Sequence, residues 1–316
     1  MKKINSRVPI AVLISVMLIF LNISIIRYVR EITGNNIKSV MGGTIIKEGL
    51  FGLEVFDGAD SKKEDDYIQR FFRPSKEKVM DKKYFFNKEG AELPKVFQAS
   101  NDVVRAYFDI ISDAANMGSK KGGMGSIGYG TAPYPEAYKL LSEDKKKAMT
   151  YESFLKSFES IGHINLLKMA EGPSVKSENS ISPRYFVEIE TIEGSDTLGK
   201  TYFAYYYGYI TLNQDGNNGW RIHSIELIPE DFLSHAYHGW HHDANSIVKF
   251  IYGDKLNIVD KVLNMENDGY FSNIIAKGKD GKQYRFTFIR ITNGADIPFR
   301  QFVMDEGKWK DVEINF

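Results

Sequence analysis

The sequence predicts an α+β protein attached to one N-terminal transmembrane helix, and three observations lead to this fold class. An apolar stretch of 19 residues lies at positions 8–26. A helical block followed by four strand-like runs fills residues 93–229, and a helical stripe followed by five strand-like runs fills residues 230–316. Helices that precede a set of antiparallel strands are typical of the α+β class, in which they cover one face of the sheet.

The apolar stretch is long enough to cross a bilayer. As a helix it would span roughly 28 Å, close to the hydrocarbon thickness of a membrane. A cleaved signal peptide is the alternative, but its apolar region is usually about 7–15 residues long and ends at a small-residue cleavage site. No such site follows Ile26. We therefore expect residues 1–30 to form an uncleaved signal anchor whose residues 8–26 contact the lipid bilayer.

The charges beside this stretch predict its orientation. Lys2, Lys3 and Arg7 precede it, while Arg27 and Arg30 follow it. The positive-inside tendency favours a cytoplasmic N-terminus. The bulk of the chain is therefore expected outside the cytoplasm, at the cell envelope, where a protein partner would bind it.

Charge and motifs argue against several ligand classes. Residues 31–316 carry 36 basic and 41 acidic side chains, a net charge of −5, whereas nucleic-acid binding requires a basic face. The glycine motif GMGSIG at residues 123–128 follows a helical pattern and precedes two prolines, whereas a nucleotide loop follows a strand and opens a helix. We expect no nucleic acid, nucleotide or cofactor, and the absence of cysteine excludes thiol catalysis.

Residues 31–92 carry no motif and are interpreted as a juxtamembrane segment. Apolar residues then recur at helical spacing from Val103 to Ala114, a second helix is expected at 135–148, and a third begins at Thr150, a good N-cap. Phe154 and Phe158 of the third helix are expected in the core, against the sheet. The strand-like runs of the sheet are residues 163–170, 184–192, 200–212 and 220–228.

The run AYKLLSEDKKKAMTYESFLKSF at residues 137–158, followed by strands, resembles the nuclear-transport-factor-2-like cone of membrane-anchored extracytoplasmic proteins of Gram-positive bacteria. The resemblance covers residues 93–229. It implies three helices packed on a curved antiparallel sheet. Members of that family are enzymes, ligand binders or assembly modules, so the resemblance implies a fold rather than a function. A departure is the glycine-rich loop at 118–130, where the family has a short link.

The C-terminal part predicts a helix packed on an antiparallel meander. An apolar stripe at helical spacing runs from Leu233 to Ile251. The strand-like runs after it are separated by turn pairs that end in glycine. These pairs are Asp268-Gly269, Asp280-Gly281, Asn293-Gly294 and Glu306-Gly307.

Two groups of residues are candidates for a ligand pocket in the cone. Tyr205 and Tyr207 share one face of a strand with period-two spacing, and their phenols could line a concave wall. The alternative is that these aromatic rings fill the core. His163 and His223, with Asp109, are the acid–base candidates that a catalytic cone would need. A structural role is the simpler interpretation for each histidine.

His235, His238 and His242 form the candidate metal site. At about 100° per residue they fall on one helical face, opposite the apolar stripe. His238 and His242 have the spacing of the zinc signature H-E-x-x-H, but Gly239 replaces the glutamate. A solvated helix face is the simpler interpretation, and a non-catalytic divalent-metal site is the alternative.

These patterns together predict a membrane-anchored extracytoplasmic binding or assembly module without catalysis of its own. Two alternatives stay open. One is a small-molecule-binding or hydrolytic enzyme that uses the cone pocket. The other is a divalent-metal-responsive module on the His235, His238 and His242 face.

Overall fold

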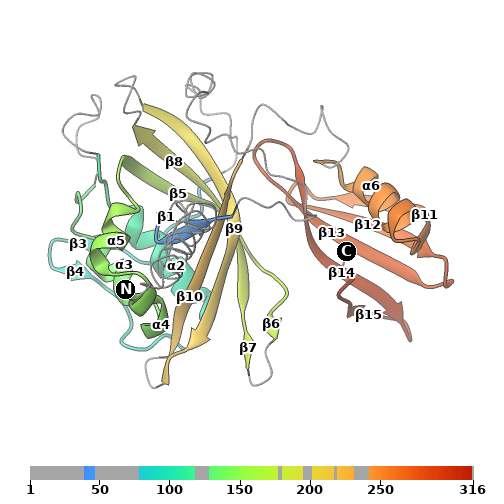
Figure 1. Ribbon diagram of the computed structural model, residues 1–316, viewed down its shortest axis with the longest axis horizontal. Coiled ribbons are helices and arrows are strands. Elements are labelled where there is room, and N and C mark those ends of the chain that lie inside the picture. Colours follow the sequence, from blue (N-terminus) through green and yellow to red (C-terminus); the bar gives the residue numbers. More distant parts are fainter. Residues whose placement is uncertain are drawn as a thin grey trace, which may run out of the picture. The chain divides into compact units, whose positions relative to one another are not determined.

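A computed structural model describes residues 39–46, 78–117, 128–176, 180–194, 201–216, 219–230 and 242–314 of the chain. Ser39–Phe316 form one compact unit. Among the described residues, far more lie in strands than in helices (Figure 1). The predicted α+β class is therefore wrong, and the described part of the chain is mostly β-sheet.

The predicted signal anchor and its transmembrane helix at residues 8–26 lie outside the described residues. Within the ranges that the structure describes, no helix is long and apolar enough to cross a membrane. The membrane-spanning part of the predicted fold class is therefore without support.

A six-stranded sheet organises the first half of the described chain. Its strand order is β1-β2-β10-β9-β8-β5. The strands are β1 (Ser39–Val40), β2 (Gly43–Ile45), β5 (Ile161–Glu171), β8 (Arg184–Gly194), β9 (Thr201–Gln214) and β10 (Trp220–Pro229). All neighbours are antiparallel except β2 and β10, which run parallel. A two-stranded hairpin, β6 (Val175–Lys176) and β7 (Ile181–Ser182), extends the β5–β8 connection.

Short helices cover one face of this sheet (Figure 1). They are α2 (Ser100–Ile111), α3 (Tyr134–Lys139), α4 (Glu143–Ala148) and α5 (Tyr151–Lys156). Phe154 and Phe158 are fully buried in the core between the helices and the sheet, as predicted. Tyr107 and Tyr134 are buried in the same core and make edge or tilted contacts with these phenylalanine rings.

The single helix predicted at 135–148 is broken into α3 and α4. Leu141 forms a β-bridge with Ile222, and the Ser142 N–H donates a 2.8 Å hydrogen bond to the Ile222 carbonyl. These bonds to β10 remove residues 140–142 from the helix. The Ser142 hydroxyl then accepts the Lys145 N–H and caps α4.

Part of the predicted juxtamembrane segment belongs to the same core. Val40, Met41 and Tyr84 are buried with the residues of α2 and the sheet. The Tyr107 hydroxyl donates to the Met41 carbonyl at 2.6 Å. Gly42 has φ +74°, and a Cβ atom there would lie 2.6 Å from both Phe154 and Tyr107, so this turn requires glycine. A small hairpin, β3 (Phe86–Asn87) and β4 (Gly90–Ala91), lies in the same segment.

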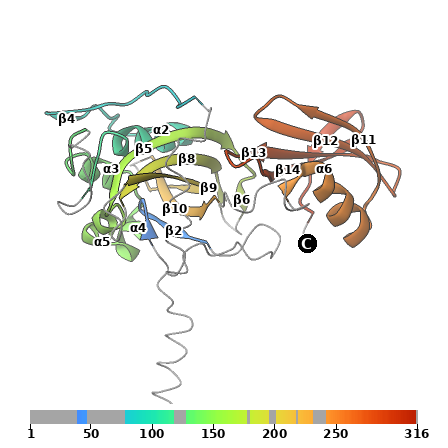
Figure 2. The same ribbon diagram turned by 90° about the horizontal axis from the view of Figure 1, so that it is seen from above.

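The C-terminal part of the described chain is a five-stranded antiparallel meander. Its strands follow chain order: β11 (Val259–Asn267), β12 (Phe271–Gly278), β13 (Gln283–Arg290), β14 (Asp296–Asp305) and β15 (Lys308–Asp311). The four predicted turn pairs lie between successive strands, and each of their glycines has positive φ. One short helix and a π-helix cover a face of the meander (Figure 2).

The helix predicted from Leu233 to Ile251 differs from the observed one. Residues 231–241 lie outside the described residues. The described helix α6 (Ala244–Ile247) starts after Asp243, whose side chain accepts the Ser246 N–H, and it continues as a π-helix, η4 (Val248–Lys255). The stripe members Ala244, Ile247, Val248 and Ile251 are buried against the meander, as the helical spacing predicted.

We predict that Phe158→Ala lowers the free energy of unfolding by about 3–5 kcal/mol, because it leaves a cavity in a packed core. Denaturant unfolding monitored by circular dichroism measures this change. Phe85→Ala is the matched control, since the Phe85 side chain is 57% exposed and its loss should cost about 1 kcal/mol or less. Equal effects of the two substitutions would contradict the observed core.

Candidate functional site

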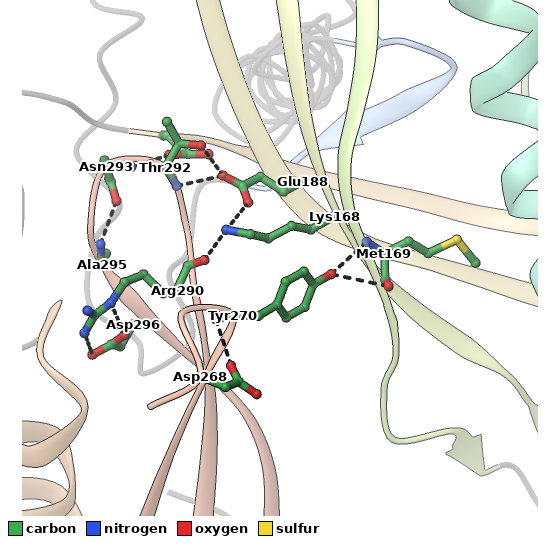
Figure 3. Close-up of polar contacts among 11 residues, drawn as sticks. Lys168, Met169, Glu188, Asp268, Tyr270, Arg290, Thr292, Asn293, Ala295 and Asp296 are labelled. Carbon is green, nitrogen blue, oxygen red and sulfur yellow. Dashed lines mark hydrogen bonds and ion pairs between the residues drawn. The ribbon is translucent and has the colours of Figure 1, made fainter. Parts of the chain in front are cut away.

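Three ionisable side chains are buried together on the face of the six-stranded sheet that the helices do not cover. They are Lys168, Glu188 and Glu230, which are 1%, 0% and 2% exposed. Lys168 comes from β5, Glu188 from β8, and Glu230 directly follows β10. The turn between β13 and β14, residues 290–296, lies against them. We call these three side chains and this turn the ionic junction (Figure 3).

A β-bulge aims Lys168 at the junction. Leu166 pairs with Ile189, but Lys168 pairs with Glu188, so Leu167 is the extra residue of β5. Without the bulge, Lys168 would share the helix-covered face with Leu166, because side chains two apart lie on one face of a strand. The extra residue turns Lys168 to the opposite face, beside Glu188.

The Lys168 ammonium group joins the six-stranded sheet to the meander. Its Nζ lies 3.0 Å from Glu188 Oε2 and donates a 2.6 Å hydrogen bond to the Arg290 carbonyl (Figure 3). The same Nζ lies 5.5 Å from the centre of the Tyr270 ring, which adds a cation–π contact. One side chain therefore contacts β8, the end of β13 and the turn that precedes β12.

The two carboxyl groups bind consecutive backbone N–H groups of the 290–296 turn. Glu188 Oε1 accepts the Thr292 N–H at 2.7 Å and the Thr292 hydroxyl at 2.6 Å. Glu230 Oε2 accepts the Asn293 N–H at 3.0 Å. Because the donors are neighbours in the chain, the two carboxyl groups lie side by side, as anions do in a nest of successive N–H groups.

The turn is closed by an ion pair and is tied to α6. Arg290 and Asp296 form a bidentate ion pair with both N–O distances 3.0 Å, a geometry that fixes orientation as well as charge. Asp296 Oδ2 also accepts the Ala244 N–H at the start of α6, at 3.1 Å. Gly294 has φ +88°, which closes the turn.

A second polar contact crosses between the sheets near Tyr270. The Met169 N–H donates to the Tyr270 hydroxyl oxygen at 3.0 Å, and this hydroxyl lies 3.4 Å from the Met169 carbonyl (Figure 3). Asp268 Oδ1 accepts the Tyr270 and Phe271 N–H groups in the β11–β12 turn. These backbone hydrogen bonds lower the pKa of Asp268.

Apolar side chains surround the junction and shield it from bulk solvent. They come from both sheets and from the 290–296 turn. The buried members are Phe186, Tyr207, Tyr209, Ile228, Ile289, Ile291, Ala295 and Ile297. In this environment burial, and secondly the charge of Glu188, raises the pKa of Glu230 well above its ordinary value. The junction therefore holds two acids and one lysine where charge is poorly solvated.

The predicted pocket tyrosines do not line the helix-covered wall of the sheet. Tyr205 and Tyr207 do share a face, as period-two spacing predicted, but it is the face opposite the helices. The Tyr205 hydroxyl donates to Glu190 Oε2 at 2.8 Å, and Glu190 Oε1 accepts the Asn165 side-chain N–H. Tyr207 packs with residues of the meander. Burial raises the pKa of both Tyr207 and Tyr209, the latter to about 12.

The acid–base candidates are not brought together. His163 lies on β5 opposite Ile192, which pairs with Phe203 of β9, whereas His223 lies on β10 beside Leu212, nine residues further along β9. At ordinary strand rise and spacing the two histidines are roughly 30 Å apart. Burial lowers the pKa of His163, whereas His223 is exposed at a bulge of β10. Asp109 has a structural role, because its Oδ2 accepts the Lys83 and Tyr84 N–H groups.

The predicted metal face cannot be assembled from the described chain. His235 and His238 lie outside the described residues, and His242 is partly buried beside Asp243, the N-cap of α6. Among the residues that the structure describes, no group of three or more histidine, aspartate or glutamate side chains has the geometry to hold a metal ion.

Comparison with protein-family models, with curated proteins and with solved structures gave no match for this chain. The resemblance to the nuclear-transport-factor-2-like cone therefore stays a prediction.

Sequence reasoning missed all three side chains of the junction. In β8, Glu188 and Glu190 alternate with Val187 and Ile189, a pattern typical of a strand with one solvated face. The signal that could have drawn attention to the site is Lys168, a lysine within the otherwise apolar run of residues 166–170. Its partners come from residues 188 and 290, which no local pattern connects with it.

We predict that Lys168→Met lowers the free energy of unfolding by about 3–5 kcal/mol, because it leaves the Glu188 carboxylate buried without a counter-charge. Adding Glu188→Gln to this variant should restore part of the loss, since the unpaired charge is then gone. A double-mutant cycle from denaturant unfolding measures the coupling.

The matched control for this cycle is Lys83→Met, which removes an exposed ion pair with Asp102. It should leave the unfolding midpoint nearly unchanged, because solvent screens exposed pairs. Additive effects of the Lys168 and Glu188 substitutions would show that the two groups are not coupled.

Proposed function

We propose that this chain is a binding or assembly protein without catalysis of its own, whose two large sheets the ionic junction holds in one fixed orientation. The observation that carries the proposal is the burial of Lys168, Glu188 and Glu230 where the two sheets meet. Burying ionic groups is costly, and apolar side chains of similar volume are often as stable or more so. Such a junction therefore contributes structural specificity rather than stability, because it holds the surfaces of the two sheets in one defined arrangement.

The packing between the helices and the six-stranded sheet supports binding at the surface over chemistry in a pocket. Tyr107, Tyr134, Phe154 and Phe158 occupy the space in which a cone-shaped fold would hold a ligand, and all four are fully buried. A substrate in this space would have to displace tightly packed aromatic rings, which costs several kcal/mol for each ring. The hydrolytic alternative therefore has less support than the binding function.

Strand β11 is the surface at which this proposal is best tested. It is an edge strand of the meander, and edge strands offer unpaired backbone groups to partners. Leu263 and Met265 of this strand expose apolar side chains to solvent. Two bulges interrupt its pairing with β12 before Asn264, so residues 264–267 form its regular part.

We predict that a photo-cross-linking amino acid at position 265 captures one discrete partner protein in cells of the source organism, because Met265 lies on the exposed regular part of β11. The same probe at position 181 is the matched control, since Ile181 is also an exposed apolar residue but belongs to the β6–β7 hairpin. The adduct is measured by its mass shift and identified by mass spectrometry. Identical adducts at both positions, or none at position 265, would contradict binding at β11.

A further inference from the structure

The ionic junction contains one more acid than base. Glu188 and Glu230 share it with a single ammonium group, that of Lys168, and all three side chains are buried from bulk solvent. If both acids were ionised, the cluster would keep a net negative charge in a poorly polarisable surrounding. Two adjacent carboxyl groups avoid this state when one of them retains its proton.

The hydrogen-bond partners identify which oxygens are involved. Glu188 Oε1 accepts two bonds from Thr292, and Glu230 Oε2 accepts one from Asn293. Among the described residues, no donor reaches Glu230 Oε1, and Glu188 Oε2 has the Lys168 ion pair but no hydrogen bond. A buried carboxylate oxygen without a donor is strongly disfavoured. A carboxylic acid O–H on Glu230 would instead supply a donor for Glu188.

We propose that Glu230 is protonated when the junction is closed and donates a hydrogen bond to Glu188, and that loss of this proton to water frees the 290–296 turn from the six-stranded sheet. The junction is then a pH-responsive lock between the two sheets. Protonation leaves one carboxylate, Glu188, paired with one ammonium group, Lys168, so that the closed cluster is neutral.

The groups around Glu230 shift its pKa in opposite directions. Burial and the neighbouring Glu188 carboxylate raise the pKa of Glu230, whereas the Asn293 N–H and the Lys168 ammonium lower it, and the net shift is upward. From β9, the Tyr207 phenol also faces Glu230. Burial raises the pKa of this phenol, and an ionised Glu230 would raise it further. The charged ends of the turn, Arg290 and Asp296, neutralise each other.

The upward shift determines how pH acts on the lock. A carboxyl group whose pKa is raised in the closed state contributes stability that is complete below its ordinary pKa of 4.5. This contribution decreases as pH rises and is lost once pH passes the raised pKa. The junction is therefore most stable in acid and opens more often towards alkaline pH.

Hydrogen exchange of the purified full-length protein tests the lock. We expect the protection of the Thr292 and Asn293 amides to fall by up to about tenfold per pH unit above pH 4.5, until the pH passes the raised pKa of Glu230. The measured rates are first corrected for the intrinsic rise of amide exchange with pH. Protection that is independent of pH would overturn the proposal.

Two substitutions separate Glu230 from other acids. Glu230→Gln should abolish the pH dependence of this protection, because its amide donates to Glu188 at every pH. Glu190→Gln is the matched control, since Glu190 is as buried as Glu230 and lies on the same face of β8 as Glu188. This variant should keep the wild-type pH dependence. The same pH dependence in Glu230→Gln as in wild type would overturn the assignment to Glu230.

Infrared spectroscopy provides an independent measurement on the folded wild-type protein. A protonated carboxylic acid has a carbonyl stretch that a carboxylate lacks, and we expect this band to persist as pH rises above 4.5, the ordinary pKa of a glutamate. The band should be absent from Glu230→Gln. If that variant does not fold, Glu188→Gln replaces it, and the band should be absent there because Lys168 would pair with an ionised Glu230. A wild-type spectrum without the band would overturn the proposal.

Discussion

The contact of the Lys168 ammonium group with Glu188 and with the Arg290 carbonyl is the interaction on which the arrangement of the two sheets depends. It joins β5, β8 and the end of β13 through one side chain. The 290–296 turn also holds the start of α6 in place, because Asp296 binds both Arg290 and the Ala244 N–H. A chain of direct polar contacts therefore runs from the six-stranded sheet to the helix that covers the meander.

The surroundings give this contact its specificity. Aromatic and aliphatic side chains from both sheets exclude water from the junction, which strengthens an ion pair of good geometry and penalises any displaced one. The apolar contacts alone would tolerate small shifts between the sheets, whereas the N–H groups of Thr292 and Asn293 fit their acceptors in one register. This combination suits a protein that presents surfaces to a partner, as proposed here.

Local patterns predicted part of this architecture correctly. Helical spacing placed Phe154 and Phe158 in the core, and the chemistry of the Asn293-Gly294 pair predicted a turn there. The fold class was nevertheless wrong, because tertiary contacts overrode helical propensity. Ser142, for example, gives its N–H to Ile222 of β10 and ends a helix that the sequence pattern would have continued. Period-two spacing likewise showed that Tyr205 and Tyr207 share a face, but not which face the helices cover.

The sequence by itself determined which residues alternate, which turns close hairpins and which apolar positions are buried, because these properties depend on neighbours a few residues apart. The tertiary structure alone decided the site. A bulge at Leu167 turned Lys168 away from Leu166, and a turn 104 residues further along the chain covered Glu188, which the strand pattern had marked as solvated. Bulges and long-range burial depend on the packing of distant elements, and no local spacing encodes them.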